Sequence, residues 1–202
     1  MPARPTLAGL RGAVQECRGC ELWQHATRGV MGDGREDAPL MLLGEQPGDK
    51  EDLAGEPFVG PAGKLLDKAL SAAGIDPADV FKTNVVKHFR FSGTRGRQRI
   101  HRSPSRVHVT ACGPWLVAEL DVVRPTGVVL LGGTAGQALY GSSFRVGESR
   151  GRILDWPESL EVRRPPTWVL PTTHPSAVLR TERRQEAFDE LVADLRLAAD
   201  AL

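Results

Sequence analysis

An acidic, glycine-rich stretch offers the first groups in the chain that could do chemistry. Glu45 and Gln46 lie between Gly44 and Gly48, and Asp49 follows directly. Glycines let a backbone approach a ligand closely, and carboxylates act as general bases or stabilise a cation. We therefore expect Glu45 to stabilise charge and accept a proton, with Gln46 and Asp49 orienting the substrate and a loop. For the glycines alone, the alternative is an ordinary cluster of turns.

A second polar segment follows a short apolar run near the C-terminal end of the chain. His174 precedes Pro175 and Ser176, and Arg180 comes a few residues later. A histidine held in place by a following proline can donate a hydrogen bond to an oxyanion. A lone histidine is more often structural, so this interpretation depends on the other segments.

Residues 81–106 are strongly basic although the whole chain is nearly neutral. They include eight Lys or Arg and no Asp or Glu, so the rest of the chain holds 18 of the 26 basic residues against all 25 acidic ones, a net charge of −7. A local positive field of this kind suits phosphate binding. We expect Arg99 and Arg102 of this segment to contact phosphates on either side of a bound nucleotide. A solvated, disordered loop is the alternative.

Three cysteines and one histidine form a candidate metal site. Cys17 and Cys20 have a chelating spacing, Cys112 supplies a third thiol, and His88 follows a predicted strand. Three thiolates and an imidazole could bind tetrahedral zinc or an iron–sulfur cluster, and the spacing does not decide between them. The alternative for Cys112 is a plain core position in its helix.

Apolar patterns predict alternating strands and helices that would position these groups. The strands are expected at residues 40–43, 80–86, 127–131 and 167–170, and the helices at residues 62–73, 107–123, 134–140 and 182–202. Such alternation predicts a three-layer α/β/α fold around a central, mostly parallel four-stranded sheet. Ligands bind beyond the C-terminal ends of strands in these sheets. The segments rich in polar motifs follow three of those ends, at residues 44–48, 87–106 and 172–176.

Composition limits the class of protein. With 41% hydrophobic and 25% charged residues, the chain is not disordered as a whole. No apolar stretch approaches the roughly 20 residues of a membrane helix, and the N-terminus lacks a secretory signal. We expect a cytoplasmic monomer with no membrane partner. We also expect one domain over residues 1–202, with an N-terminal arm, residues 1–36, that contributes metal ligands.

Five motifs in one order resemble those of the family 4 uracil-DNA glycosylases, over most of the chain from about residue 17 to residue 180. They are the stretch 44–48, Glu51-Asp52, Pro57-Phe58-Val59-Gly60, Thr83-Asn84-Val85-Val86-Lys87 and His174-Pro175-Ser176. Gln46 stands where that family has alanine, and His88 where it has a cysteine. These departures and the basic insertion around His101 resemble the UdgX group, although Arg97 and Gln98 differ from the Lys-Arg pair common there.

The resemblance implies an activity, a cofactor and a substrate. It implies a 4Fe–4S cluster held by Cys17, Cys20, His88 and Cys112. It also implies excision of uracil from single- or double-stranded DNA, followed by covalent trapping of the protein on the abasic sugar through His101. The neighbouring arginines would disfavour protonation of that imidazole by like-charge repulsion.

Roles for the pocket residues also come from the resemblance. Phe58 would stack on the flipped base, and His174 would donate toward uracil O2. Asn84 would read uracil O4 and N3–H, because an amide offers both an acceptor and a donor. The remaining residues that we place at the substrate are Gly44, Gly48, Ser176 and Arg180.

Two alternatives stay open. One is a multiple-turnover glycosylase in which Glu45 or Asp49 activates water and His101 only contacts phosphate. The other is a non-catalytic, zinc-stabilised nucleic-acid-binding module. This second alternative leaves the glycine-rich stretch, Asn84 and His174 without roles.

Overall fold

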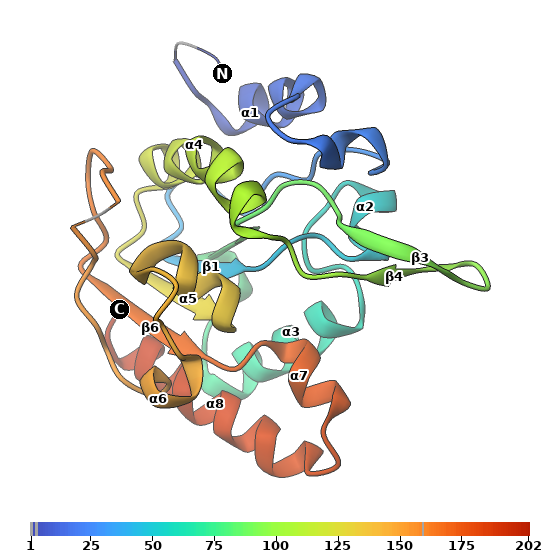
Figure 1. The fold of residues 1–202 in the computed structure, drawn as a ribbon. Helices are drawn as coiled ribbons and strands as arrows, with labels where there is room; N and C mark the ends of the chain where they lie inside the picture. Colours follow the sequence, from blue (N-terminus) through green and yellow to red (C-terminus); the bar gives the residue numbers. More distant parts are fainter. Residues whose placement is uncertain (1, 3, 159) are drawn as a thin grey trace.

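A four-stranded parallel sheet forms the centre of the computed structural model, which describes residues 2, 4–158 and 160–202 (Figure 1). The strand order is β2-β1-β5-β6. The strands are β1 (Leu40–Gly44), β2 (Val80–Asn84), β5 (Gly127–Leu131) and β6 (Trp168–Thr172). Because the strands are parallel, their C-terminal ends meet at one edge of the sheet.

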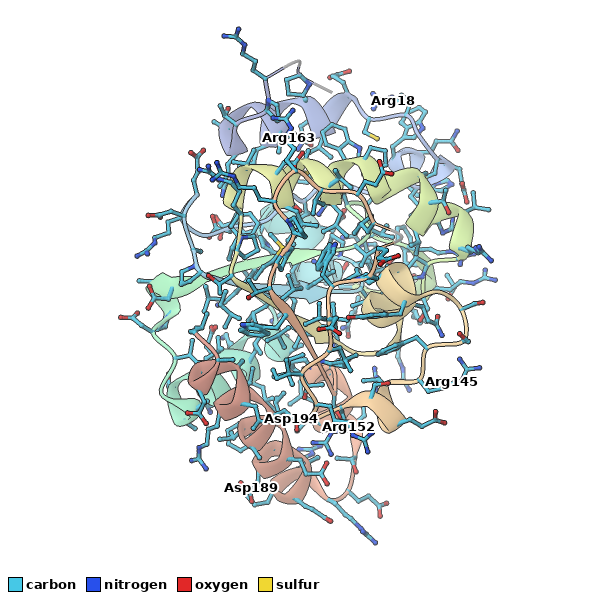
Figure 2. All side chains as sticks on the ribbon, turned by 90° about the vertical axis from the view of Figure 1, so that its left-hand side faces the viewer. Arg18, Arg145, Arg152, Arg163, Asp189 and Asp194 are labelled. Carbon is cyan, nitrogen blue, oxygen red and sulfur yellow. The ribbon has the colours of Figure 1, made fainter. Side chains whose placement is uncertain are left out.

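Helices cover both faces of this sheet (Figure 1). One face packs against α3 (Pro61–Ala73), α7 (Pro175–Arg180) and α8 (Arg184–Asp200). The other packs against α4 (Arg106–Val123) and α5 (Gly133–Tyr140). Side chains of β1 alternate between the two cores, with Leu40 and Leu42 in one and Met41 and Leu43 in the other, as the period of a strand requires. Side chains fill the space between the layers (Figure 2).

The N-terminal arm packs on the outer side of α4. It holds α1 (Leu7–Ala13) and two short 3-10 helices, Val14–Glu16 and Glu21–Gln24. Leu10, Val14 and Met31 form a small core with Trp115 and Ala118 of α4. The arm therefore extends the α4 layer of the molecule.

A two-stranded antiparallel hairpin projects from the main sheet, and Figure 1 shows it at the right of the molecule. Its strands are β3 (Phe91–Arg95) and β4 (Gln98–His101). The remaining elements are short: α2 (Asp49–Ala54), α6 (Val146–Ser149) and the 3-10 helix Pro77–Asp79. The hairpin forms the middle of the basic segment, residues 81–106, which is therefore folded rather than a disordered loop.

The predicted three-layer α/β/α fold and its four parallel strands are confirmed. The expected β5 agrees with the structure residue for residue, whereas β2 ends at Asn84, two residues early, and β6 runs on to Thr172. The hairpin, α1, α2, α6 and α7 were not predicted. Within the described residues, no helix is long and apolar enough to span a bilayer.

Candidate active site

A pocket of about 480 Å³ lies where the four parallel strands end. Its lining includes Glu45 after β1, Asn84 at the end of β2, Leu131 at the end of β5 and Thr173 after β6. The expected site residues that line it are Glu45, Gln46, Gly48, Phe58, Asn84, His101, His174, Ser176 and Arg180. Those outside the lining are Gly44, Asp49, Arg99 and Arg102.

Glu45 is the only carboxylate of the expected set in this lining, and two side chains hold it. The Thr134 hydroxyl donates to Oε2, and His101 Nε2 lies 3.2 Å from Oε1. Burial acts to raise the pKa of Glu45, but the interactions with His101 and Thr134 outweigh it, so the pKa lies below its ordinary value. The carboxylate is therefore ionised at neutral pH and can stabilise a cation.

His174 is fixed as a neutral hydrogen-bond donor. Its Nδ1 accepts from the Ser176 backbone N–H at 3.1 Å, and the Ser176 hydroxyl is 2.8 Å away. A ring nitrogen that accepts from an amide carries no proton, so in the neutral ring the proton is on Nε2. Burial lowers the pKa of His174 to about 4. The ring thus presents a neutral Nε2–H group at the pocket.

Gly44 is required by the close approach of two pocket side chains. A Cβ at this position would lie 2.4 Å from Asn84 Oδ1 and 2.8 Å from Phe58 Cζ. Asn84 is adjacent in register on β2 and is 3% exposed. Phe58 has a φ of 59°, which is rare for a residue with a side chain. A strained backbone of this kind persists where the surroundings enforce it, often at a functional site.

Gln46 clamps the two ends of the hairpin. Its Nε2 donates to the carbonyl oxygens of Arg90 and Arg102, each at 3.1 Å. Its Oε1 accepts from the Arg90 backbone N–H at 3.0 Å. Gln46 is 7% exposed, and these bonds use its amide donor and acceptor to orient the loop that carries His101.

Arg99 was expected to contact a phosphate, but in the structure it is paired with two carboxylates. Its Nε donates to Asp49 at 2.5 Å and one terminal nitrogen donates to Asp52 at 2.7 Å. The two carboxylates are three residues apart on the first turn of α2 and so share a face. The guanidinium also lies over the rings of Phe89 and Phe91. Arg99 and Asp49 therefore fasten the hairpin to α2, while Arg102 is exposed.

His101 ends β4 with its side chain 49% exposed. Its ring lies 6.1 Å from the ring of Phe89, centroid to centroid, and faces Glu45. Asp49 and Asp52 pair with Arg99, and the carboxylate of Glu45 lies beside the His101 ring. This arrangement differs from the expected surroundings of repelling arginines.

Three of the four candidate metal ligands, the thiols of Cys17, Cys20 and Cys112, lie near one another where the arm packs on α4. Cys112 is 2% exposed, and burial raises its pKa to about 11, with Cys20 and Cys17 near enough to raise it further. The Lys87 backbone, next to buried His88, hydrogen-bonds to the Cys112 sulfur. Even so, among residues 2, 4–158 and 160–202 no group of three or more His, Cys, Asp or Glu side chains could hold a single metal ion.

Sequence reasoning missed the turn between β5 and α5. Gly132, Gly133 and Thr134 all line the pocket, and Thr134 bonds to Glu45. The available signal was a glycine pair between a predicted strand and a predicted helix, the same pattern that pointed to residues 44–48. The fourth strand end of the sheet therefore also contributes to the site.

Fold and pocket together define an α/β protein whose site lies at the carboxyl ends of parallel strands and combines two carboxylates, Glu45 and Glu51, with two histidines. The profile of the Uracil DNA glycosylase superfamily matches residues 31–196. The chain belongs to this superfamily.

Two proteins that are similar to this chain in sequence are both named Type-4 uracil-DNA glycosylase. The Type-4 uracil-DNA glycosylase of Sulfurisphaera tokodaii is 33% identical over 190 residues, which cover 92% of this chain and 81% of that protein. The Type-4 uracil-DNA glycosylase of Thermotoga maritima is 35% identical over 173 residues, covering 85% of this chain and 82% of that protein. The chain thus aligns with about four-fifths of the length of both relatives.

Proposed function

We propose that the protein excises uracil from DNA and then becomes bonded to the abasic sugar through His101, as the resemblance to the UdgX group implies. One observation carries this proposal. The hairpin brings His101 Nε2 to 3.2 Å from Glu45 Oε1, inside the pocket that also holds Phe58, Asn84 and His174.

Base excision requires stabilisation of two opposite charges. The bond from uracil N1 to deoxyribose C1′ breaks with both electrons leaving on uracil, so the sugar becomes a cation and the base an anion. Ionised Glu45 stabilises the first charge, and the neutral Nε2–H of His174 donates to the second. These groups act on a base that has been rotated out of the stack.

The pocket offers the contacts that a flipped uracil needs. The ring of Phe58 supplies an aromatic face, and buried Asn84 supplies a donor and an acceptor for the pyrimidine edge. Cytosine would place an amino group where uracil has O4. The buried amide of Asn84 would then be left without a matching hydrogen-bond partner, so the pocket should bind cytosine much more weakly than uracil. This selectivity rests on Asn84 keeping one orientation against Gly44.

His101 then competes with water for the sugar cation. One imidazole nitrogen gives its lone pair to C1′, and the other loses its proton to Glu45 and from there to solvent. The uracil anion takes a proton from solvent. The product is a neutral imidazole joined to C1′, which is a poor leaving group, so the bond persists.

Multiple turnover with water as the nucleophile is the second candidate. It uses the same pocket and only the fate of the DNA differs. The clamping of the hairpin favours trapping, because Gln46 and Arg99 hold His101 beside Glu45 rather than leaving it free to follow a phosphate.

The test is to incubate the protein with uracil-bearing DNA and run a denaturing gel. His101→Ser should abolish the slow-migrating adduct while uracil release stays measurable. Arg97→Lys, which keeps the charge at an exposed position in the turn of the same hairpin, is the matched control and should retain the adduct. An adduct that persists in His101→Ser would rule out this residue as the nucleophile.

We also propose that Cys17, Cys20, His88 and Cys112 hold a 4Fe–4S cluster that braces the arm against α4. The clustering of the three thiols supports this, and a cluster is larger than one ion, so its ligands stand further apart. Protein purified without oxygen should be brown and contain about four iron atoms per chain with matching sulfide. A colourless protein with stoichiometric zinc would contradict the proposal.

A further inference from the structure

The turn between β5 and α5 touches both charge-handling groups of the pocket. Gly132 has a φ of 89°, and a Cβ there would lie 3.0 Å from the Cβ of His174. Two residues further on, the Thr134 hydroxyl donates to Glu45 Oε2. The chain separation of Thr134 and Glu45 is 89 residues, so this contact exists only in the folded protein.

We propose that Thr134 is a positioning residue that fixes one oxygen of Glu45 so that the other faces His101. The inference deepens the proposed function and rests on it for the role of His101. Thr134 touches no reacting atom, and its effect passes through the carboxylate.

The two oxygens of Glu45 have different surroundings. Oε2 is held by Thr134. Oε1 is buried and lacks a well-aligned hydrogen bond within the part of the chain that the structure describes, although His101 Nε2 is 3.2 Å away. A buried carboxylate oxygen without a full partner is costly, so it favours a donor that comes into line. The ring N–H that His101 keeps when its other nitrogen attacks the sugar is such a donor, because the positive charge of the resulting imidazolium strengthens it.

The backbone around Thr134 restricts the position of its hydroxyl group. The Gly132 N–H bonds to the Thr172 carbonyl at 2.9 Å, and Ala135 is fully buried. A β-branched side chain has few χ1 states. The donor is therefore held between two strand ends, β5 and β6, rather than on a mobile loop.

Three groups from three elements act on Glu45. Thr134 comes from α5 and His101 from the hairpin, and both hydrogen-bond to the ionised carboxylate and favour it, whereas His174, from the start of α7, adds to this only when its ring is protonated. Removing the Thr134 hydroxyl removes one of these interactions. A carboxylate with fewer stabilising partners takes up a proton at higher pH, so activity that needs ionised Glu45 should fail earlier as the pH falls.

The test compares Thr134→Val, which removes the hydroxyl at nearly constant shape, with Thr134→Ser, which keeps it. Two quantities are measured for each protein: the pH dependence of uracil release, and the fraction of released uracil that yields an adduct. Valine should move the acid limb of release to higher pH and lower the adduct fraction about tenfold, the effect of one charge-assisted hydrogen bond. Serine should stay near the parent protein in both.

Thr134→Ala serves as a second hydroxyl-free variant, and thermal unfolding identifies any variant that fails to fold. A valine or alanine variant with an unchanged acid limb and unchanged adduct fraction would overturn the role of Thr134. Absence of any adduct in the parent protein would instead overturn the trapping function. In that case the acid limb of uracil release still decides the role of Thr134.

Discussion

His174 carries its proton on a defined nitrogen because the chain turns immediately after it. Pro175 begins α7, and the Ser176 N–H points back to His174 Nδ1. The histidine therefore acts as the N-cap of α7, with its ring in the place of the usual small polar cap. The structural role of this histidine is compatible with the proposed functional one, since the cap is what selects the tautomer.

The low pKa of His174 makes the folded protein sensitive to acid. The ring stays neutral in the folded state down to a pKa of about 4, whereas in the unfolded chain it binds a proton below about pH 6.5. The unfolded state therefore binds more protons in this window, and stability falls as the pH drops from about 6.5 to 4, by at most about 3 kcal/mol.

His174→Asn provides the measurement, because an asparagine oxygen can accept the Ser176 N–H in place of Nδ1 without titrating. The free energy of unfolding by urea should converge between parent and variant as the pH is lowered. A difference between the two proteins that is constant from pH 7 to pH 4 would contradict the proposed neutral histidine.

At the scale of elements, the pattern of apolar residues in the sequence was sufficient to predict the strands of the central sheet and the long helices. Runs such as residues 127–131 are buried on both faces, so their sequence shows the burial directly. The hairpin gave no such signal, since every residue of β3 after Phe91 is exposed. Helix α7 has six residues, too few for a helical pattern to be recognised.

The residues of the site likewise fall into those that the sequence could predict and those that only the folded structure shows. Glu45, Asn84 and His174 could be found because they lie at or just after strand ends and belong to motifs. The two ion pairs of Arg99 and the contact of Thr134 with Glu45 could not be found from the sequence. The ion pairs join residues that are 50 and 47 positions apart, and the contact of Thr134 with Glu45 spans 89 positions. Charge counting alone treats Arg99 as a phosphate ligand, whereas its partners are two carboxylates of α2.

The anchoring of the hairpin predicts the behaviour of a conservative substitution. Arg99→Lys replaces a planar fork that bridges two carboxylates with a single ammonium group, so it should loosen β4. Displacement of a reacting group by about 1 Å can reduce a rate up to about a hundredfold. We expect at least tenfold slower adduct formation, measured as band intensity over time, with a smaller effect on uracil release.

Arg97→Lys is the matched control for this substitution. It lies in the exposed turn of the hairpin and should form the adduct at the parent rate. Equal adduct rates for Arg99→Lys and Arg97→Lys would show that the contact with α2 does not position His101.

At the scale of the whole molecule, one basic projection stands out from an otherwise acidic protein. Positive charge concentrated on the hairpin would hold DNA beside the pocket and leave the other faces repelling it. Arg95 and Arg97 are exposed on this hairpin. We infer that they supply much of the electrostatic affinity, and that paired Arg99 does not.

The salt dependence of DNA affinity measures how much Arg95 and Arg97 contribute to binding. Changing both Arg95 and Arg97 to Gln should reduce the slope of log affinity against log salt by about 2, since each phosphate contact contributes about 0.9 for duplex DNA. The control carries Lys68→Gln and Arg196→Gln, two exposed positions on α3 and α8, and loses the same charge. Equal slopes for the two double variants would mean that total charge, not the hairpin, governs binding.

Trapping through His101 is tested most directly by mass spectrometry of the protein after reaction with uracil-bearing DNA. The complex is digested with protease and nuclease, and the peptides are fragmented to locate any added group. The expected result is a peptide carrying a deoxyribose remnant on the His101 ring, with free uracil in equal amount. Uracil release accompanied only by unmodified peptides spanning residue 101 would contradict the account.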